Sequence, residues 1–348
     1  MEKFILNFIK TFQPETAHYL TIQLLKNFYF LIKNVDDDPI LLSRLGNLEL
    51  RNPIGLAAGF DKNAEAISAI QRLGFGFIEC GTVTPNPQYG NSKPRVFRLQ
   101  EDRALINRLG FNSKGLERFK TNFNKKNNSN SKVGINIGPN KLSNNFIDDY
   151  IFLFKSIYDQ SDYITINLSS PNTQGLRDMQ KIESLDILTR ELKVIKDEKK
   201  AKKNVFIKID PDSSDKDYDN IINIVYKNNI NGLIVANTSK GRPQTLRGKF
   251  LPQNGGLSGL PIRDLSNKVL SHISRQTKGE KILIGVGGIS NGNDIYEKIK
   301  LGASAVQLYT ALTYDGSSLI QSMKKDLIKF LKDDGFKNVQ EAVACKIN

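Results

Sequence analysis

Histidine and cysteine are both scarce in this sequence of 348 residues, which contains two of each. Cys80 and Cys345 lie far apart and fit no metal-binding spacing, so we expect neither a metal site nor a disulfide framework. A reducing compartment is therefore expected. His18 falls in an N-terminal helical segment and His272 in a helical stretch far from any predicted strand end, which excludes most histidine-based catalysis.

Long apolar runs are also missing. No segment approaches the roughly 20 apolar residues that a membrane-spanning helix needs. Residues 4–12 are apolar, but Asn7 and Lys10 interrupt them and no small-residue cleavage site follows. A secretory signal peptide is therefore not expected.

The charge balance is strongly positive, with a formal net charge of +14. Nucleic acid is not an expected partner, because the basic residues form no stripe interleaved with aromatic side chains. Basic runs such as residues 196–203 are typical of solvated helix ends and loops. An anionic membrane surface is the better partner for this charge.

Residues 1–34 have the pattern of two amphipathic helices, followed by a linker at residues 35–39. The first helix has apolar residues at helical spacing, namely Phe4, Ile5, Phe8, Ile9 and Phe12. Pro14 suits the first turn of the second helix. The apolar stripe of that helix is predicted to contain Ala17, Leu20, Leu24, Phe28 and Leu31, widened by Leu25, Tyr29 and Ile32. Such helices lie in the membrane interface rather than crossing it.

The rest of the chain alternates short β-rich runs with helical stretches. The eight runs are residues 54–60, 77–83, 133–138, 163–169, 205–210, 232–238, 282–288 and 305–310. This rhythm predicts an α/β fold, a (β/α)8 TIM barrel spanning residues 35–348, with residues 1–34 as a small N-terminal helical extension. The long gaps at 84–132 and 239–281 must hold extra structure.

Each β-rich run ends in polar or glycine residues. The active site of such a barrel lies at the carboxyl ends of its strands. Turn chemistry accounts for Gly, Asp and Asn in any single loop, but not for Lys62 and Lys208 at the tips of apolar strands. The alternative for Lys62 is a helix-surface lysine that follows a strand, and for Lys208 a snorkelling edge residue. The glycine-rich loop 285–290 suits either a tight turn or an anion, and together with the other strand ends it predicts a phosphorylated ligand.

These residues resemble the dihydroorotate dehydrogenase family over about residues 35–335. The segments that carry the resemblance are AAGFDKN (57–63), GTVTPNPQYGNSKPRVFRL (81–99), INRLGFNSKG (106–115), INIGPNK (135–141), INLSSPNTQGLR (166–177), GGLSG (255–259) and IGVGGI (284–289). The N-terminal helix pair, and Ser170 in place of a cysteine, are similar to the membrane-associated, quinone-using class.

The resemblance implies a bound FMN and a dihydroorotate site. The positions that match flavin-contacting residues are Ala58, Gly59, Phe60, Asp61, Lys62, Thr82, Asn136, Asn167, Lys208, Ala236, Gly259, Gly288, Tyr309 and Thr310. The positions that match substrate-contacting residues are Lys62, Asn107, Arg108, Leu109, Gly110, Phe111, Asn167, Asn172, Asn237 and Thr238. Ala236 stands where the family often has a hydroxyl residue, so only a backbone contact to FMN is expected there.

Oxidising a carbon–carbon bond beside a carbonyl needs a base for the proton and an acceptor for the hydride. No side chain accepts hydride, so the flavin must. Ser170 is the candidate catalytic base, activated by a hydroxyl or water relay because no histidine is at hand. Turn chemistry in SSPN is the alternative role for Ser170. Lys62 is expected to stabilise negative charge on the substrate.

The resemblance also implies a quinone site beside the flavin. His18 and Arg98 are its candidate polar groups, although an exposed helical histidine and a surface arginine are the ordinary alternatives. The expected acceptor is ubiquinone or menaquinone, and the expected location is the cytoplasmic face of the inner cell membrane, as a peripheral protein. Two other functions stay open: another FMN-dependent barrel oxidoreductase, or a non-redox barrel that binds a phosphate-bearing ligand.

Overall fold

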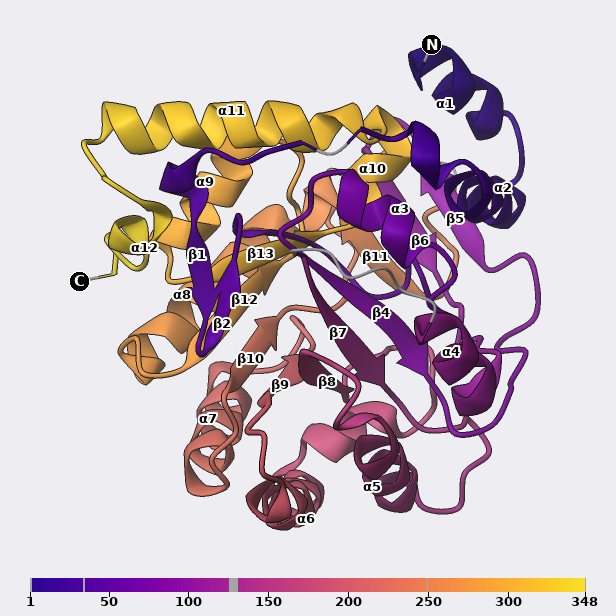
Figure 1. Ribbon diagram of the computed structural model, residues 1–348. Coiled ribbons are helices and arrows are strands. Elements are labelled where there is room, and N and C mark those ends of the chain that lie inside the picture. Colours follow the sequence, from indigo (N-terminus) through magenta and orange to yellow (C-terminus); the bar gives the residue numbers. More distant parts are fainter. Residues whose placement is uncertain (1, 34, 125–130, 249, 348) are drawn as a thin grey trace.

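The computed structural model describes residues 2–33, 35–124, 131–248 and 250–347. Eight parallel strands close into a barrel in the order β10-β12-β13-β3-β4-β7-β8-β9 (Figure 1). The predicted (β/α)8 barrel is confirmed, and each barrel strand overlaps one of the eight predicted runs. The strands are β3 (Ile54–Leu56), β4 (Phe77–Val83), β7 (Lys132–Ile137), β8 (Tyr163–Asn167), β9 (Asn204–Ile209), β10 (Gly232–Val235), β12 (Ile282–Val286) and β13 (Ala305–Leu308).

Helices surround the barrel because parallel neighbours need a crossover connection between them. The helices of this layer are α3 (Ile67–Arg72), α4 (Gly115–Phe123), α5 (Phe146–Ile157), α6 (Ile182–Glu198), α7 (Asp215–Lys227), α8 (Arg263–Thr277), α9 (Gly292–Lys300), α10 (Thr310–Asp315) and α11 (Ser318–Asp333), with the short α12 (Val339–Ala342) after them. Their apolar faces form one continuous core with the outer faces of the strands.

Aromatic side chains fill the barrel interior near the amino ends of the strands. Phe77, Tyr163 and Phe206 are fully buried there and stack edge to face with one another. Space for them comes from glycine on neighbouring strands, because a Cβ atom at Gly134 would lie 2.1 Å from Cζ of Tyr163. This end of the barrel is therefore packed solid, and any binding site must lie at the other end.

A short hairpin closes the packed end. It consists of β1 (Ser43–Leu45) and β2 (Leu48–Leu50), which pair antiparallel. Leu45 and Leu50 are fully buried against the aromatic side chains of the interior.

A small antiparallel sheet accounts for much of the two long gaps between the predicted strands. Its strands are β5 (Val96–Leu99), β6 (Ala104–Asn107) and β11 (Gly256–Gly259), in the order β11-β6-β5. We predicted extra structure in both gaps but not this sheet, because its pairing joins two segments that are far apart in the sequence.

Two N-terminal helices lie where they were predicted, at α1 (Glu2–Lys10) and α2 (Pro14–Asn27). The second helix is shorter than predicted, because the chain leaves it at Phe28 and forms a 3-10 turn at Tyr29–Leu31. Phe28 and Leu31 are exposed instead of continuing a packed stripe. Aromatic residues in succession favour a helix weakly, and Tyr29 instead contacts Arg72 of α3, whose guanidinium carbon lies 5.5 Å from the ring centroid. Among the described residues, no helix has the length and apolar character to cross a membrane.

Polar contacts attach the helix pair to the barrel. Arg95 is almost fully buried and pairs with Glu15 of α2 at 2.9 Å. Arg98 donates to the backbone carbonyls of Lys10 and Phe12 at 2.9 and 2.8 Å, at the end of α1. The helices thus have a defined position against β5, and the division into units at residues 34 and 35 stays a prediction.

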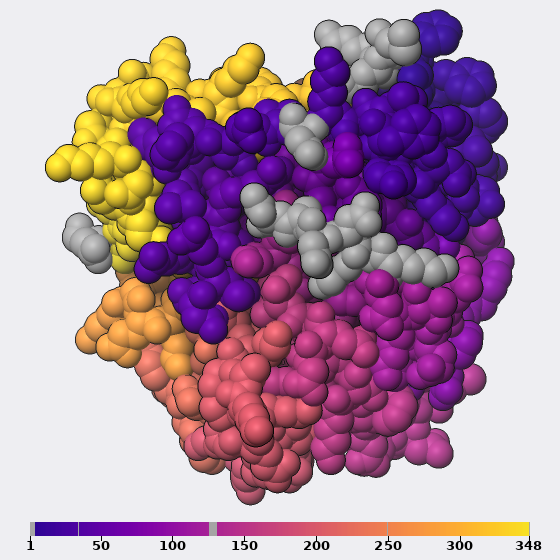
Figure 2. All heavy atoms as spheres, in the orientation of Figure 1, coloured from indigo at the N-terminus to yellow at the C-terminus, as the bar shows by residue number. Residues whose placement is uncertain are grey.

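The predicted linker is held by a buried ion pair. Asp37 binds Lys324 of α11 and also pairs with Arg51 at 3.2 Å. Both Asp37 and Lys324 are nearly fully buried. The N-terminal residues and α11 consequently run along the same edge of the molecule, in indigo and yellow (Figures 1 and 2).

Asp37→Ala should lower the free energy of unfolding by about 3–5 kcal/mol, because it leaves the Lys324 ammonium buried without its carboxylate. Urea unfolding followed by circular dichroism measures this. Asp36→Ala is the matched control, since Asp36 is exposed and should change stability by less than about 0.5 kcal/mol. Equal stabilities for the two variants would show that the ion pair does not anchor the linker.

Candidate functional site

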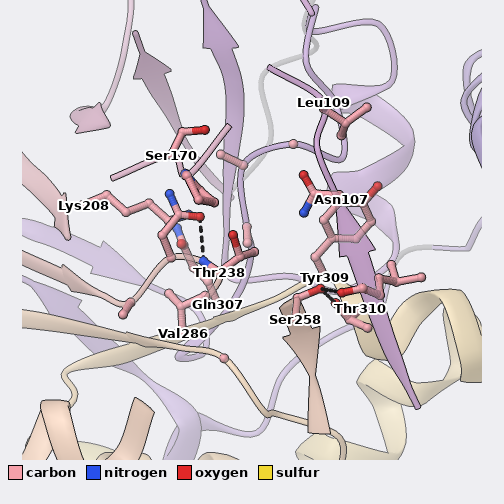
Figure 3. A pocket seen from close by; sticks show the side chains of 18 of the residues that line it. Asn107, Leu109, Ser170, Lys208, Thr238, Ser258, Val286, Gln307, Tyr309 and Thr310 are labelled. Carbon is pink, nitrogen blue, oxygen red and sulfur yellow. Dashed lines mark hydrogen bonds between the residues drawn. The ribbon is translucent and has the colours of Figure 1, made fainter. Parts of the chain in front are cut away.

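A cavity of about 190 Å³ opens at the carboxyl ends of the barrel strands. Most of the predicted site residues line it, although they come from seven of the eight barrel strands, from β6 and β11, and from the loops that follow these strands (Figure 3). Those that line it are Ala58, Gly59, Lys62, Thr82, Asn107, Leu109, Gly110, Phe111, Asn167, Ser170, Asn172, Lys208, Ala236, Asn237, Thr238, Gly259, Gly288, Tyr309 and Thr310.

Three predicted residues lie behind the cavity wall. Asp61 accepts hydrogen bonds from the backbone N–H groups of Glu65 and Ala66, both at 2.8 Å. Burial raises the pKa of Asp61 to about 6. Asn136 lies below the cavity, where it donates a hydrogen bond to Glu79. Arg108 lies over the Phe97 ring, 4.8 Å from its centroid. A direct ligand contact for each of the three stays a prediction.

The floor of the cavity is organised by Glu79, which we did not predict. This carboxylate is fully buried in the middle of β4. It accepts hydrogen bonds from Asn136 Nδ2 at 2.7 Å, Thr165 Oγ1 at 2.9 Å and Gln307 Nε2 at 2.9 Å. The only signal in the sequence is a charged residue inside the apolar run FIECGTV, and that run does not identify the partners.

Lys208 provides a buried positive charge above this floor. It is 5% exposed and lines the cavity, and its ammonium group makes no hydrogen bond to the described residues. Desolvation lowers the pKa of Lys208, while the carboxylate of Glu79 raises it. The ammonium group is therefore available to a ligand that carries partial negative charge.

Two further features of the floor indicate a ligand with both donors and acceptors. Gln307 Oε1 is buried and has no hydrogen-bond partner among the described residues. At Gly59, with φ of +101°, an added Cβ would meet only Tyr309, at 3.7 Å, and would occupy the cavity. A flat heterocycle with N–H and carbonyl groups matches this combination.

Amide side chains form a connected group above the floor. Asn167 donates to Thr82 Oγ1 and to Asn136 Oδ1, both at 3.2 Å. Asn237 donates to Asn167 Oδ1 at 3.2 Å. Because an amide carries both donors and acceptors, Asn167 can contact one ligand at the floor and another above it.

Ser170 lies in the turn after β8, on the same side as these amides. Its side chain is mostly buried, and its hydroxyl accepts the N–H of Asn172 at 3.3 Å. The Asn172 amide in turn donates to Asn107 Oδ1 at 3.4 Å. Neither histidine of the chain is a partner of Ser170: His18 contacts Tyr309 and His272 binds Asp219.

A second cavity, of about 300 Å³, lies between the N-terminal helices and the barrel. Its lining is mostly apolar and includes Ile5, Leu6, Ile9, Leu24 and Leu25 from the helices and Leu312, Thr313, Gly316 and Ser317 from the C-terminal part of the chain. The second group was not predicted, because nothing in its sequence pattern points to a cavity. The two cavities share a wall formed by Lys62, Val96, Leu105, Leu109 and Tyr309.

Both predicted quinone-side residues line the second cavity, together with Phe60. His18 lies 3.4 Å from the Tyr309 hydroxyl. Desolvation, and to a smaller extent the charge of Lys62, lower the pKa of His18 to about 3, so its ring is neutral at neutral pH. Arg98 Nε is buried without a hydrogen-bond partner in the described chain, which leaves a donor at this end of the cavity.

Residues 40–331 match the model of the dihydroorotate dehydrogenase family. The chain belongs to this family. A relative from Rhodospirillum rubrum, named dihydroorotate dehydrogenase (quinone), is 42% identical over 332 residues, which cover 95% of this chain and 90% of the relative. The mitochondrial dihydroorotate dehydrogenase (quinone) of Mus musculus is 41% identical over 339 residues, and the alignment covers 95% of this chain and 86% of that protein.

A solved structure confirms the relationship at the level of the fold. The ligand-free dihydroorotate dehydrogenase of Eimeria tenella superimposes with a TM-score of 0.93 at 37% identity. The match covers 97% of this chain and 100% of that structure.

Within the described part of the chain, Lys62 is the one charged residue that the two cavities share. Its ammonium group donates to the carbonyl of Gly59 at 2.8 Å. Burial lowers the pKa of Lys62 to about 8, although Glu15 acts in the opposite direction. A negatively charged ligand on either side of the wall would stabilise the protonated form.

The pKa of Lys62 predicts how the stability of the ligand-free protein depends on pH. The folded-state pKa is depressed, so burial of the ammonium opposes folding fully below pH 8 and is relieved as pH rises from about 8 to about 10.5. Relative to Lys62→Met, the wild type should therefore gain stability across this window. Urea unfolding of both proteins between pH 7.5 and 9.5 measures the difference, and a constant difference would contradict a depressed pKa.

Proposed function

We propose that this protein oxidises dihydroorotate to orotate in pyrimidine biosynthesis and passes the electrons through FMN to a membrane quinone. The observation that carries the proposal is the pair of cavities with one common wall. The first is lined by amides, lysines and glycines, and the second is apolar and opens beside amphipathic helices. The names of the quinone-dependent relatives support the same reaction.

FMN fits the donors and acceptors of the first cavity, and it would supply the hydride acceptor that no side chain provides. Gln307 Oε1 and the Lys208 ammonium are buried polar groups that need such a partner. The residues that would hold FMN are Ala58, Gly59, Lys62, Thr82, Asn136, Asn167, Lys208, Ala236, Gly259, Gly288, Tyr309 and Thr310.

Dihydroorotate would occupy the part of the cavity bounded by the amides and by residues 107–111. Asn107, Asn172 and Asn237 can pair with the ring amides of the substrate by donating and accepting together. Lys62 would balance the negative charge of the substrate. These groups orient the substrate before any proton moves.

Ser170 would remove the substrate proton. A serine hydroxyl is a weak base, so the proton must leave it through a second acceptor. Thr173, three residues further along the same turn, supports such a relay because its hydroxyl is buried and has no partner among the described residues. The sequence reasoning anticipated a relay but did not identify this hydroxyl.

The N-terminal helices would bring the second cavity to the membrane. Phe4 and Phe8 are 78% and 59% exposed, so these two rings of α1 are not covered by the barrel. An exposed apolar face with nearby lysines favours binding in the interface of an anionic leaflet. We place the protein on the cytoplasmic face of the inner membrane, with ubiquinone or menaquinone entering between α1 and α2.

Ser170→Ala should leave FMN and orotate bound but slow flavin reduction by about 10²–10⁴-fold, the usual effect of removing a positioned base. Anaerobic stopped-flow absorbance measures the rate, and an orotate titration of the flavin spectrum checks binding. In the wild type the rate should rise toward alkaline pH, because a hydroxyl base acts better there. A near wild-type rate in the variant would remove Ser170 from this role.

Deletion of residues 1–34 should abolish reduction of long-tailed quinones while flavin reduction by dihydroorotate persists. Because the deletion also removes Glu15 from the buried Arg95, Phe4→Glu with Phe8→Glu is a milder companion variant. It should lose binding to vesicles that contain anionic phosphatidylglycerol. Phe152→Glu, which changes an aromatic residue on α5 that is 52% exposed, is the control and should bind normally.

These assays separate the roles of the helices. Equal loss of quinone turnover and flavin reduction, with a collapsed circular dichroism spectrum, would mean that the helices only stabilise the fold. Equal retention of both activities would rule out the second cavity as the quinone site.

A further inference from the structure

Lys298, in the last turn of α9, is a fully buried lysine outside both cavities. Its ammonium group donates to Ser266 Oγ at 2.6 Å and to Asn267 Oδ1 at 2.7 Å, both on α8. It forms no ion pair with a carboxylate of the described residues. Asp294, on the same helix, instead accepts hydrogen bonds from the backbone and side chain of Ser290. A buried ammonium without a carboxylate is costly, so packing alone does not explain it.

Ser266 connects this lysine to the glycine loop after β12. Its hydroxyl lies 3.0 Å from the carbonyl oxygen of Gly287 and 3.2 Å from that of Arg263, and it can donate to either. The loop is pressed against the start of α8, because a Cβ atom at Gly288 would lie 2.2 Å from the Cα of Arg263. Gly287 and Gly288 have φ angles of +105° and +74°, which only glycine adopts easily.

The hydrogen bond from Ser266 determines which side of the loop faces the cavity. With the Gly287 carbonyl directed at α8, the N–H of Gly288 in the same trans peptide points to the other side, and the N–H of Ile289 is next along the loop. Neither group donates a hydrogen bond to any described residue. Both residues line the first cavity. Successive free N–H groups of this kind form a concave site for an anion.

We propose that Lys298 is a positioning residue for the flavin phosphate. Through Ser266 it holds loop 287–289 in the shape that binds an anion, and it supplies the buried positive charge that the phosphate balances. Lys298 does not touch the phosphate, since Ser266 and the loop lie between them. The inference rests on the proposed function, because it takes FMN as the ligand.

The charge of Lys298 makes FMN binding dependent on pH. Burial lowers the pKa of Lys298 to about 7; Asp294 raises it and Arg263, from α8, lowers it further. A phosphate dianion behind the loop would raise this pKa, so binding takes up a proton when the lysine starts deprotonated. FMN affinity should therefore fall as pH rises from 6.5 to 8.5. Riboflavin has the same ring and no phosphate, so its affinity should change little.

The test compares FMN with riboflavin on the full chain after removal of its flavin, with binding followed by quenching of flavin fluorescence. Lys298→Met should weaken FMN binding by roughly 10- to 100-fold, the range expected when the charge-assisted hydrogen bond to Ser266 that holds the loop is lost. Riboflavin affinity should stay within about twofold, and the pH dependence of FMN binding should disappear. Lys300→Met, which removes a lysine of the same helix that pairs with Glu297, should leave the preference for FMN unchanged.

Ser266→Ala provides a second measurement if Lys298→Met folds poorly. This variant keeps the charge of Lys298 but removes the Ser266 hydroxyl that connects it to the loop. It should therefore weaken the binding of FMN but not of riboflavin, and FMN binding should stay dependent on pH. Equal weakening of both flavins in Lys298→Met or Ser266→Ala would mean a purely structural role and would overturn the proposal. If the wild type binds neither flavin, the proposed function itself is wrong. If it binds both flavins with equal affinity, the proposed phosphate site is wrong but the proposed function is not.

Discussion

Closure of eight parallel strands is the constraint on which the other features depend. A closed parallel barrel has all its carboxyl ends on one rim, so side chains from β3 to β13 meet there although they are separated by more than half of the chain. Aromatic side chains fill the other end, and the hairpin with Leu45 and Leu50 seals it. The buried carboxylate of Glu79 is tolerable only inside such a closed wall, where Asn136, Thr165 and Gln307 all reach it.

The N-terminal helices add a second environment to this rim. They are fixed by the Glu15–Arg95 ion pair and by the Asp37–Lys324 pair at the linker. Between these anchors the helices keep an apolar cavity against the wall that contains Lys62 and Tyr309. One rim thus borders a polar cavity inside the barrel and an apolar cavity outside it, which is the arrangement that a soluble substrate and a lipid-soluble acceptor require.

Much of this arrangement could be predicted from the sequence, because the relevant signals are local. Apolar runs ending in polar residues located all eight strands and placed Lys208 and Ser170 at the rim. The signals failed where the partner is distant in sequence: Glu79 needs Gln307, and β6 needs β11. Lys298 was missed for the same reason, since a lysine at helical spacing resembles a surface residue until α8 is packed on it. The early end of α2 was also missed, because periodicity alone does not show where the chain turns toward α3.

The common wall has a kinetic consequence. Lys62, Leu109 and Tyr309 line both cavities, so under the proposed function the two reactants would bind close together in separate cavities. Neither reactant has to leave before the other arrives, and no atom has to cross between them. Under the proposed function, electrons would cross this wall while neither reactant does. A compound that fills one cavity would then not compete with the reactant that binds in the other.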